Sequence, residues 1–426
     1  MSNDLLWTLV SFAVMFFFNV PIVFGLIFSS CVYLFLSGID PSMVTQKLIG
    51  GMDSFILLAI PLFILAAELM NTLGLSKRIY GFALSLVGRI PGSLAHTNVL
   101  SSMIFAGMSG SSAADAAGIG VMEIKAMNDE GYDPAFSAAV TAASSTIGPI
   151  IPPSIPMVVY GSIAGVSVGK LFMGGLVPGI IMGLLMMVIC YFDAVKNGFR
   201  STGAVSLRQF IKIFMDSVWG LLGPVILLGG IYAGLFTPTE AAAVAAVYAL
   251  LIGILVYKEL DLKSLREILS KTVVGSAMVL LIIGAANLFG WIIANEGIPN
   301  LLTEAFISFT DNKYVALLLI NVLFLILGCF MEINAIMLLF LPILIPVVTN
   351  LGVDLVHFGV VTVLNMMIGT LTPPFGMMTF IVTGIAKVPL ARVFQKLTPF
   401  VIALLALLIL ITYVPDVVMW LPNTMK

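Results

Sequence analysis

Long apolar stretches separated by short polar gaps run along the whole chain. A bilayer-spanning helix needs roughly 20 apolar residues, and the chain holds such stretches for about ten crossings, with several shorter pieces besides. Of the 426 residues, 60% are hydrophobic and 9% are charged, whereas soluble domains carry about 25% charged residues. The pattern therefore predicts an all-α polytopic membrane protein. A net charge of −2 offers no basic surface for nucleic acid.

Basic residues gather in some of the polar gaps and avoid the others. The basic gaps lie at residues 77–89, around Lys125, and at 196–212, 258–271 and 387–396. The remaining gaps and the C-terminus hold Lys47, Lys170, Lys313 and Lys426, four of the 19 Lys and Arg residues. Because basic loops stay in the cytoplasm, one threading leaves the other 15 inside. Near Asn19 and Pro21 a break permits either one long bent crossing or two short ones.

The chain also repeats itself at an offset of 221 residues (328 minus 107). This offset aligns Gly107 with Gly328, Gly148 with Gly369, Pro152 and Pro153 with Pro373 and Pro374, Met157 with Met378, and Pro178 with Pro399. In the threading above, residues 163–170 fall outside and their partners 384–391 fall inside. The two copies are therefore predicted to be inverted, which is the construction of many secondary transporters.

Paired prolines interrupt an apolar helix at equivalent places in both copies. The two breaks are GPIIPPSIP (Gly148–Pro156) and GTLTPPFGM (Gly369–Met377). Proline has no N–H to donate and clashes with the preceding turn, so each helix has to open there. The freed carbonyls need protein, water or an ion as partners at membrane depth. A simple proline kink closed by neighbouring helices is the alternative at either site alone.

Each break follows a segment with the pattern of a re-entrant hairpin. The first, roughly Ser93–Met122, contains the small-residue run GMSGSSAADAAGIG with Asp115 as its acid. An acid at this depth indicates function, although Asp115 could instead cap the second half of the hairpin. The second hairpin, roughly Tyr314–Pro346, carries Glu332 and Asn334 at its tip. Both tips are expected to present polar groups to one central cavity.

Two amphipathic segments precede the hairpin-containing halves and divide the chain into six parts. Residues 75–92 and 258–271 alternate basic and apolar positions at helical spacing, as interfacial helices do. They are predicted either to act as arms joining a fixed scaffold to a moving unit or to be inert linkers. The parts are scaffold helices at 1–74, the first arm at 75–92, a transport half at 93–192, central scaffold helices at 193–257, the second arm at 258–271 and a second half at 272–426.

Four motifs together resemble the large membrane subunit of the tripartite ATP-independent periplasmic (TRAP) transporters. They are SGSSAADAAG at 109–118, GPIIPPS at 148–154, the tip residues Met331, Glu332 and Asn334, and TPPFG at 372–376. The resemblance covers essentially the whole chain. It implies a multi-pass protein of the bacterial inner membrane that imports an organic acid, of the sialic acid or C4-dicarboxylate class, with Na⁺ as coupling ion and no other cofactor.

The same resemblance implies two protein partners and a mechanism. A periplasmic binding protein would deliver the substrate, and a separate small four-helix membrane subunit would pack beside this chain. Transport would follow an elevator mechanism, in which a domain carrying both hairpins slides against the scaffold. The protein is then a transporter and not an enzyme.

Candidate binding residues follow from the hairpin tips and breaks. Because open carbonyls and hydroxyls are hard ligands that suit Na⁺, two ion sites are expected at symmetry-related positions. The first comprises Ser109, Ser111, Gly148, Ile151 and Pro153, and the second Gly328, Gly369, Thr372 and Phe375. The residues expected to bind the substrate are Ser111, Ser112, Asp115, Ser154, Glu332 and Asn334.

Other functions fit the chain less well. A symporter of the same architecture that works without a binding protein stays open. The GMSG string at Gly107–Gly110 matches an intramembrane serine protease motif, but only His96 and His357 are present as bases. GVSVGKL at Gly165–Leu171 lacks the spacing and the final hydroxyl of a phosphate-binding loop. A channel would not explain the paired breaks.

Overall fold

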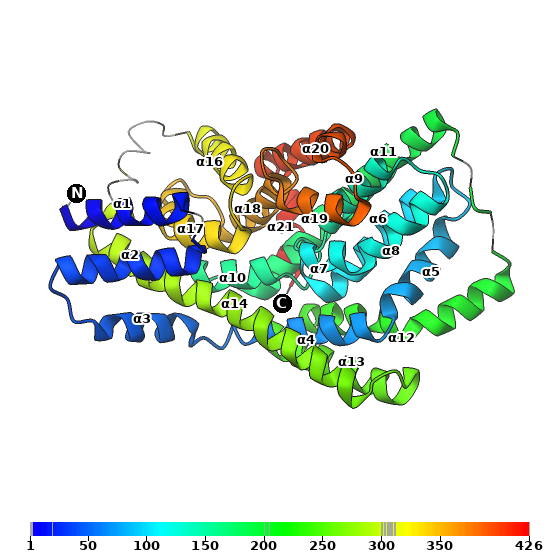
Figure 1. Ribbon diagram of the computed structural model, residues 1–426, viewed down its shortest axis with the longest axis horizontal. Coiled ribbons are helices and arrows are strands. Elements are labelled where there is room, and N and C mark those ends of the chain that lie inside the picture. The colour runs from blue at the N-terminus through cyan, green and yellow to red at the C-terminus, as the bar shows by residue number, and fades with distance from the viewer. Residues whose placement is uncertain are drawn as a thin grey trace.

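A computed structural model describes residues 3–425 except 19, 200, 204, 300, 302–303, 305–309 and 311. Asn19, Arg200 and Lys426, which enter the predicted topology, lie outside this part of the chain. The described residues form helices and no strand, as predicted (Figure 1). Within the described residues, six helices are long and apolar enough to cross a membrane, or seven spans if one bent pair counts as one. Six more apolar helices have only 10–17 residues, so the expected ten crossings are not ten long helices.

The helices have the following bounds: α1 Asn3–Phe17, α2 Ile22–Leu36, α3 Ser42–Met52, α4 Ala59–Thr72, α5 Leu75–Val87, α6 Ser93–Ser109, α7 Ser112–Ala117, α8 Ile119–Asp129, α9 Pro134–Ser145, α10 Ile155–Ala164, α11 Val168–Asn197, α12 Leu207–Tyr232, α13 Pro238–Leu251, η1 Ile252–Tyr257, α14 Leu262–Asn295, α16 Lys313–Gly328, α17 Ile333–Asn350, α18 Leu355–Gly369, α19 Met377–Ala386, α20 Leu390–Tyr413, α21 Asp416–Met419 and η2 Pro422–Thr424.

The N-terminal apolar segment forms two short helices and not one bent crossing. Helices α1 and α2 pack against each other along their length (Figure 1). Pro21 is the N-cap residue of α2, where its fixed φ and missing N–H are tolerated because the first turn of a helix has no internal acceptor for that group. The segment is therefore two helices, and their crossing of the membrane stays a prediction.

Two pairs of helices begin at positions that the offset of 221 residues relates. Adding 221 to Pro134, where α9 begins, gives 355, the first residue of α18, and adding it to Ser112 of α7 gives 333, the first residue of α17. The contacts show the same correspondence: α7 of the first copy packs on α19 of the second, and α17 of the second copy packs on α10 of the first. Figure 1 shows the hairpin α6–α8 in the right half of the view and the hairpin α16–α17 in the left half. Which side of the membrane each copy faces stays a prediction.

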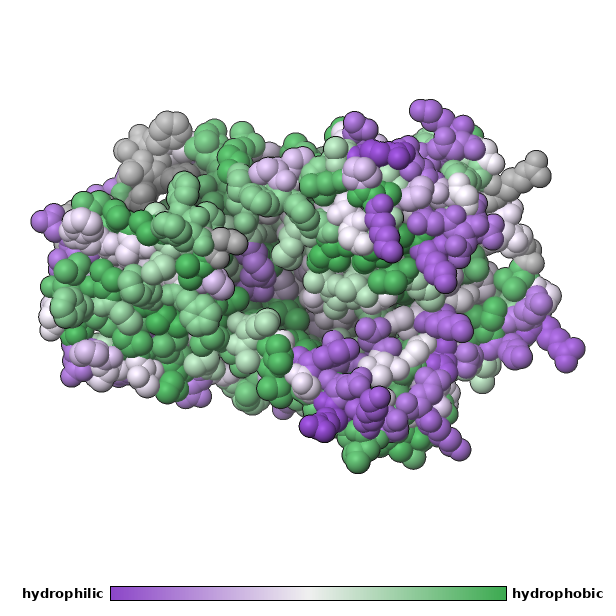
Figure 2. Space-filling model, viewed as in Figure 1, coloured by the Kyte–Doolittle hydropathy of each residue, from purple (hydrophilic) through white to green (hydrophobic). Residues whose placement is uncertain are grey.

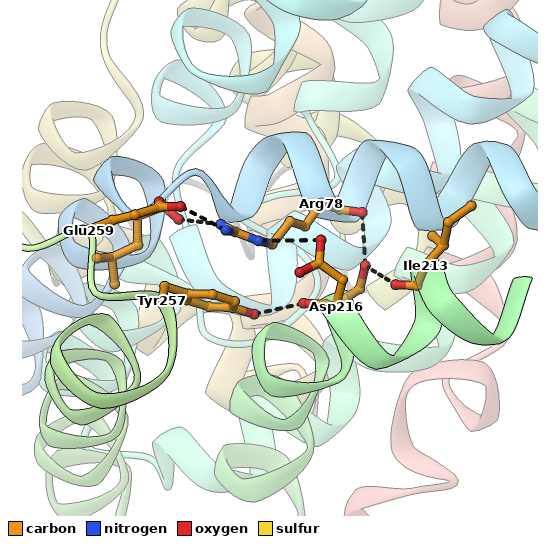
Figure 3. A network of polar contacts seen from close by, with 7 residues as sticks. Arg78, Ile213, Asp216, Tyr257 and Glu259 are labelled. Carbon is orange, nitrogen blue, oxygen red and sulfur yellow. Dashed lines mark hydrogen bonds and ion pairs between the residues drawn. The ribbon is translucent and has the colours of Figure 1, made fainter. Parts of the chain in front are cut away.

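Helices α4 and α5 meet at a sharp corner that a cluster around Arg78 fixes (Figure 3). The two axes are bent by 72°, and Gly74 between them has a φ of +62°, which favours glycine. The Arg78 guanidinium donates to the Leu73 carbonyl at 2.7 Å and pairs with Glu259 at 2.7 Å. It also lies 3.9 Å from the centre of the Tyr257 ring. This corner makes residues 75–87 a separate helix, and its role as an arm stays a prediction.

The second arm differs from its prediction. Residues 258–271 do not form a helix of their own, because α14 runs from Leu262 to Asn295 as one helix of 34 residues. Nothing in the sequence ends it at 271: no proline follows, and Gly275 keeps a helical backbone. Along this one helix the residues change from basic near its start to apolar further on, so the change in composition does not mark the end of a helix. The proposed boundary at residue 192 likewise falls inside α11.

The start of α14 is fixed at Asp261. Its carboxylate accepts a hydrogen bond from the Ser264 N–H at 2.7 Å, as N-cap residues do. Hydrogen bonds from Ser264 hold the pKa of the Asp261 carboxyl below its ordinary value. The helix therefore begins in the basic polar gap and continues into the apolar part of the molecule without a hinge.

Polar residues are unevenly distributed over the visible face of the molecule. Figure 2 shows hydrophilic residues gathered over the part that holds α5, α8 and the C-terminal end of α11, while hydrophobic residues dominate over α1 and α2. The exposed apolar side chains include Phe17, Phe24 and Phe35 on α1 and α2. This distribution agrees with a chain whose basic loops share one side of a membrane.

Candidate functional site

A cavity of about 480 Å³ lies where the two hairpin tips face helices α4 and α14. The tips contribute Ser109, Gly110, Ser111, Ser112, Ala113, Ala114, Glu332, Ile333 and Asn334 to its lining. Helices α4 and α14 contribute Ile64, Ala67, Glu68, Lys271, Gly275, Met278, Val279 and Ile282. Two segments more than 200 residues apart (332 minus 109 is 223) thus bring polar side chains to one cavity whose remaining lining is mainly apolar.

The tip of the first hairpin turns at Gly110 and sits on the first break. Gly110 has a φ of +61°, and a Cβ there would lie 2.5 Å from the Pro153 carbonyl oxygen. The Ile155 N–H donates to the Gly110 carbonyl at 3.4 Å. Ser111 then caps α7, because its hydroxyl oxygen accepts from the Ala114 N–H at 3.4 Å. Only glycine fits both the conformation and the close approach at this turn.

Asp115 lies directly behind this tip. Its side chain is buried, with 1% of the residue exposed, and one oxygen accepts a hydrogen bond from the Ser109 hydroxyl. The other oxygen, Oδ2, has no hydrogen-bond partner in the structure. A Cβ on Gly148 would lie 2.9 Å from that oxygen, so Oδ2 faces the first break. Asp115 does not cap the half-helix, since Ser111 does.

The first break is buried and borders the cavity through Pro149, Ile155 and Pro156. Residues 146–154 are all buried. Ser154 caps α10 by accepting from the Met157 N–H at 3.2 Å, and its hydroxyl donates to the Pro149 carbonyl at 2.5 Å. The side chain of Ile151 packs toward Gly179 of α11. Ser154 and Asp115 are therefore close to the cavity but do not line it.

The second tip carries its carboxylate at the N-terminus of a helix. Glu332 is the N-cap residue of α17 and accepts from the Ala335 N–H at 3.1 Å. The Asn334 amide donates to the other Glu332 oxygen at 2.7 Å, which leaves Asn334 Oδ1 buried without a partner. Both side chains line the cavity. The Asn334 amide oxygen and the Glu332 carboxylate, which caps α17, thus face the same cavity as Ser111 and Ser112.

The second predicted ion site lies beside this tip. The backbones of Gly328 and Gly369 approach so closely that a Cβ on Gly369 would lie 2.7 Å from the Gly328 Cα. Thr372 donates its hydroxyl hydrogen to the Ile368 carbonyl at 2.8 Å. Phe375 is 54% exposed, and its ring packs edge-on against Phe330 at 5.8 Å. These residues are neighbours, but none of them lines the central cavity.

Sequence reasoning missed two charged residues of the cavity wall. Glu68 on α4 and Lys271 on α14 both line it and lie 3.8 Å apart. Glu68 stands inside an apolar run, a signal that indicates function in a membrane segment. Lys271 was hidden because its charge grouped it with the basic residues of the second arm. Ser109 is hydrogen-bonded to Asp115 and not to a histidine, and His357 contacts the Ile411 carbonyl.

Comparisons with known proteins cover nearly the whole chain. A family model described as "Tripartite ATP-independent periplasmic transporter, DctM component" matches residues 9–417. The chain is 44% identical over 410 residues to the sialic acid TRAP transporter large permease protein SiaM of Vibrio cholerae, with 96% of each chain covered. It is 38% identical to the C4-dicarboxylate TRAP transporter large permease protein DctM of Rhodobacter capsulatus, over 95% of this chain and 96% of that protein.

Two further comparisons extend the likeness. The sialic acid TRAP transporter permease protein SiaT of Haemophilus influenzae is 40% identical over 99% of this chain, which spans 69% of that protein. Among solved structures, the Alcanivorax borkumensis YdaH transporter matches with a TM-score of 0.62 and 16% identity, and 87% of each chain is covered. At this identity the structural likeness concerns the fold alone.

Proposed function

The chain belongs to the DctM component family of the tripartite ATP-independent periplasmic transporters, and we propose that it imports a sialic acid by symport with Na⁺. A C4-dicarboxylate is the second substrate class, since relatives named for each class are similar over nearly the whole chain. The observation that carries the proposal is the cavity at which polar side chains of both hairpin tips meet. Its size is in the range of small-molecule sites, which are clefts of roughly 300–1,000 Å³.

The chemistry of the tips supports an oxygen-rich substrate. Ser111, Ser112 and Asn334 offer hydroxyl and amide groups to the cavity, and Glu332 offers carboxylate oxygens. Hydroxyl groups of a sugar acid would donate to the carboxylate and to the amide oxygen of Asn334, which has no partner in the structure. The hydroxyls of Ser111 and Ser112 would donate to an anionic group, since the Glu332 carboxylate already occupies the N-terminal end of α17.

The first ion site would be built from the tip and break of the first repeat. Ser109, Ser111, Gly148 and Pro153 meet around Gly110, and Asp115 Oδ2 faces Gly148 without a partner. A buried carboxylate needs a positive charge or hydrogen bonds to offset its desolvation, and oxygen ligands suit a hard cation. Ile151 would contribute its backbone oxygen. Gly328, Gly369, Thr372 and Phe375 would form the second site through backbone oxygens.

Two protein partners complete the proposal. The match to only 69% of the length of SiaT supports a small four-helix membrane subunit as a partner. A periplasmic binding protein would deliver the acid. Both hairpins and breaks would then move as one body against α3, α4, α13 and α14, which pack on one another, in an elevator mechanism that carries the hairpin tips and the bound substrate across the inner membrane.

Reconstitution into proteoliposomes tests the proposal. The chain and its small subunit would be assayed for uptake of radiolabelled N-acetylneuraminate and succinate, with and without the cognate binding protein. A monoanion carried with two Na⁺ moves one net charge, which 100 mV assists by roughly 2.3 kcal/mol. Uptake should therefore need an inward Na⁺ gradient and accelerate with an inside-negative potential. Uptake that ignores both would contradict Na⁺ symport, and full activity without the binding protein would favour a stand-alone symporter.

A further inference from the structure

The cavity has a second wall whose charges the tips do not explain. Three charged side chains line it: Glu332 from the second tip, Glu68 from α4 and Lys271 from α14. Among the lining residues, all from the part of the chain that the structure describes, Lys271 is the sole Lys or Arg. Two acids and one base surround a space that, on the proposed function, receives an anion. Lys271 is therefore the one lining side chain whose charge attracts a substrate carboxylate.

The Glu68–Lys271 pair is loose. Lys271 Nζ and Glu68 Oε2 lie 3.8 Å apart, and the side chains are 65% and 26% exposed. A charge-assisted hydrogen bond spans about 2.7–2.9 Å, which Arg78 and Glu259 reach at 2.7 Å. An exposed ion pair at the longer distance contributes little stability. The three donors of the Lys271 ammonium thus stay accessible to a molecule in the cavity.

The surroundings of the pair point to a role in the cavity. Beyond Lys271, α14 presents Met278, Val279 and Ile282 to the same space, and Ile64 and Ala67 flank Glu68 on α4. Against this apolar wall the ammonium is the one group that attracts a carboxylate. Because α14 is continuous from Leu262, Lys271 is held by a helix that does not belong to either hairpin.

The position of Lys271 along α14 indicates on which side of the cavity the Glu68–Lys271 pair lies. Lys271 follows the first residue of α14 by nine positions, which is about 14 Å along a helix rising 1.5 Å per residue. That helix begins in a basic gap, which predicts the cytoplasmic side. The pair therefore lies on the predicted cytoplasmic approach to the cavity.

We propose that Lys271 and Glu68 form an exit subsite for the substrate carboxylate, an inference that rests on the proposed import of an organic acid. The carboxylate passes from the hairpin tips to the Lys271 ammonium, which turns from Glu68 to receive it. Glu68 then competes for the ammonium and promotes release. Lys271 is in this sense a specificity-determining residue on the non-moving wall, selective for the acid group and indifferent to the rest of the molecule.

Binding to the full chain in nanodiscs tests this subsite. The probes are N-acetylneuraminate, its uncharged methyl ester, and succinate. We expect Lys271→Gln to weaken binding of N-acetylneuraminate about tenfold and to leave the ester unchanged, because only the acid offers a charge to the ammonium. Lys271→Arg should restore most of the affinity, and Glu68→Gln should tighten binding of the acid. Lys263→Gln, on the same helix outside the cavity, is the matched control and should behave as wild type.

The outcomes separate the subsite from the proposed function. Unchanged binding of the acid by Lys271→Gln, or equal losses for acid and ester, would overturn the subsite while leaving organic acid transport intact. A wild-type chain that binds neither N-acetylneuraminate nor succinate would overturn the proposed function and the subsite with it. Melting temperatures of all four variants within a few degrees of wild type would show that affinity changes are not caused by unfolding.

Discussion

The two proline breaks occupy equivalent positions in the repeats, yet their surroundings differ. Residues 146–154 of the first break are all buried, and Ser154 closes it by capping α10. In the second break, Pro373, Pro374 and Phe375 are exposed, and α19 begins after Gly376 with no side-chain cap. The same proline motif is therefore buried in the first copy and largely exposed in the second. The repeat conserves the backbone path but not its environment.

The two hairpin tips that pack on these breaks also differ in how they contact them. In the second repeat, Gly328 meets Gly369 directly. The equivalent of Gly328 in the first repeat is Gly107, but there the close contact is made three residues later, by Gly110 against Pro153. The first tip thus extends further over its break, and it brings Asp115 with it. We expect the first repeat to tolerate change less well than the second.

The largest effect is expected for Gly110→Ala. A residue other than glycine in the left-handed region costs roughly 1–2 kcal/mol, and the new Cβ would overlap the Pro153 carbonyl oxygen at 2.5 Å. Uptake by the reconstituted complex should fall more than tenfold. Gly165→Ala is the control, since Gly165 has a similar φ of +66° with nothing within 4 Å of a Cβ. Equal losses in both variants would show that conformation alone matters and that the tip contact does not.

The next effect separates the two acids at the tips. Asp115→Asn removes the charge that faces Gly148, so the Na⁺ concentration for half-maximal uptake should rise about tenfold. Glu332→Gln keeps an acceptor for the Ala335 N–H and should change that concentration less than threefold, while lowering affinity for the substrate. Uptake measured against Na⁺ at fixed substrate, and then the reverse, distinguishes the two results. A larger Na⁺ effect in Glu332→Gln would move the stronger ion site to the second repeat.

The sequence predicts the hairpins and breaks themselves better than it predicts how deeply each break is buried. The offset of 221 residues and the proline pairs predict both hairpins and both breaks, because proline and glycine act on the backbone locally. Burial of one break and exposure of the other depends on which helices pack against each, and no local pattern encodes that. Lys271 illustrates the same limit: its position in a basic cluster predicts an interfacial arm, whereas the uninterrupted helix α14 brings it to the cavity.

A smaller effect is expected for a hydroxyl residue within each of the two breaks. Ser154→Ala removes an N-cap, which costs about 1 kcal/mol, and leaves the buried Pro149 carbonyl without its donor, which costs a further 1–3 kcal/mol or so. Thermal unfolding in detergent should therefore show a lower midpoint. Thr372→Ala, at a half-buried position in the second break, should shift the midpoint little, because the Thr372 hydroxyl only donates to the Ile368 carbonyl near the C-terminal end of α18. Similar midpoints for both variants would mean that enclosure of the first break adds no stability.

The smallest effect is expected for Phe375→Ala, and it tests how the second ion site would work. The ring is 54% exposed, and its edge-on contact with Phe330 contributes about 0.5–1.5 kcal/mol beyond burial in typical pairs, less where water or lipid reaches it. If Phe375 contributes its backbone oxygen to Na⁺, truncation of the ring leaves that ligand in position. Half-saturation by Na⁺ should then stay within about twofold of wild type, as binding through backbone dipoles at a helix end requires. A loss of Na⁺ dependence in Phe375→Ala would instead mean that the ring itself shields the site. The open edge of the second break would then be a cover for the ion and not merely an exposed loop.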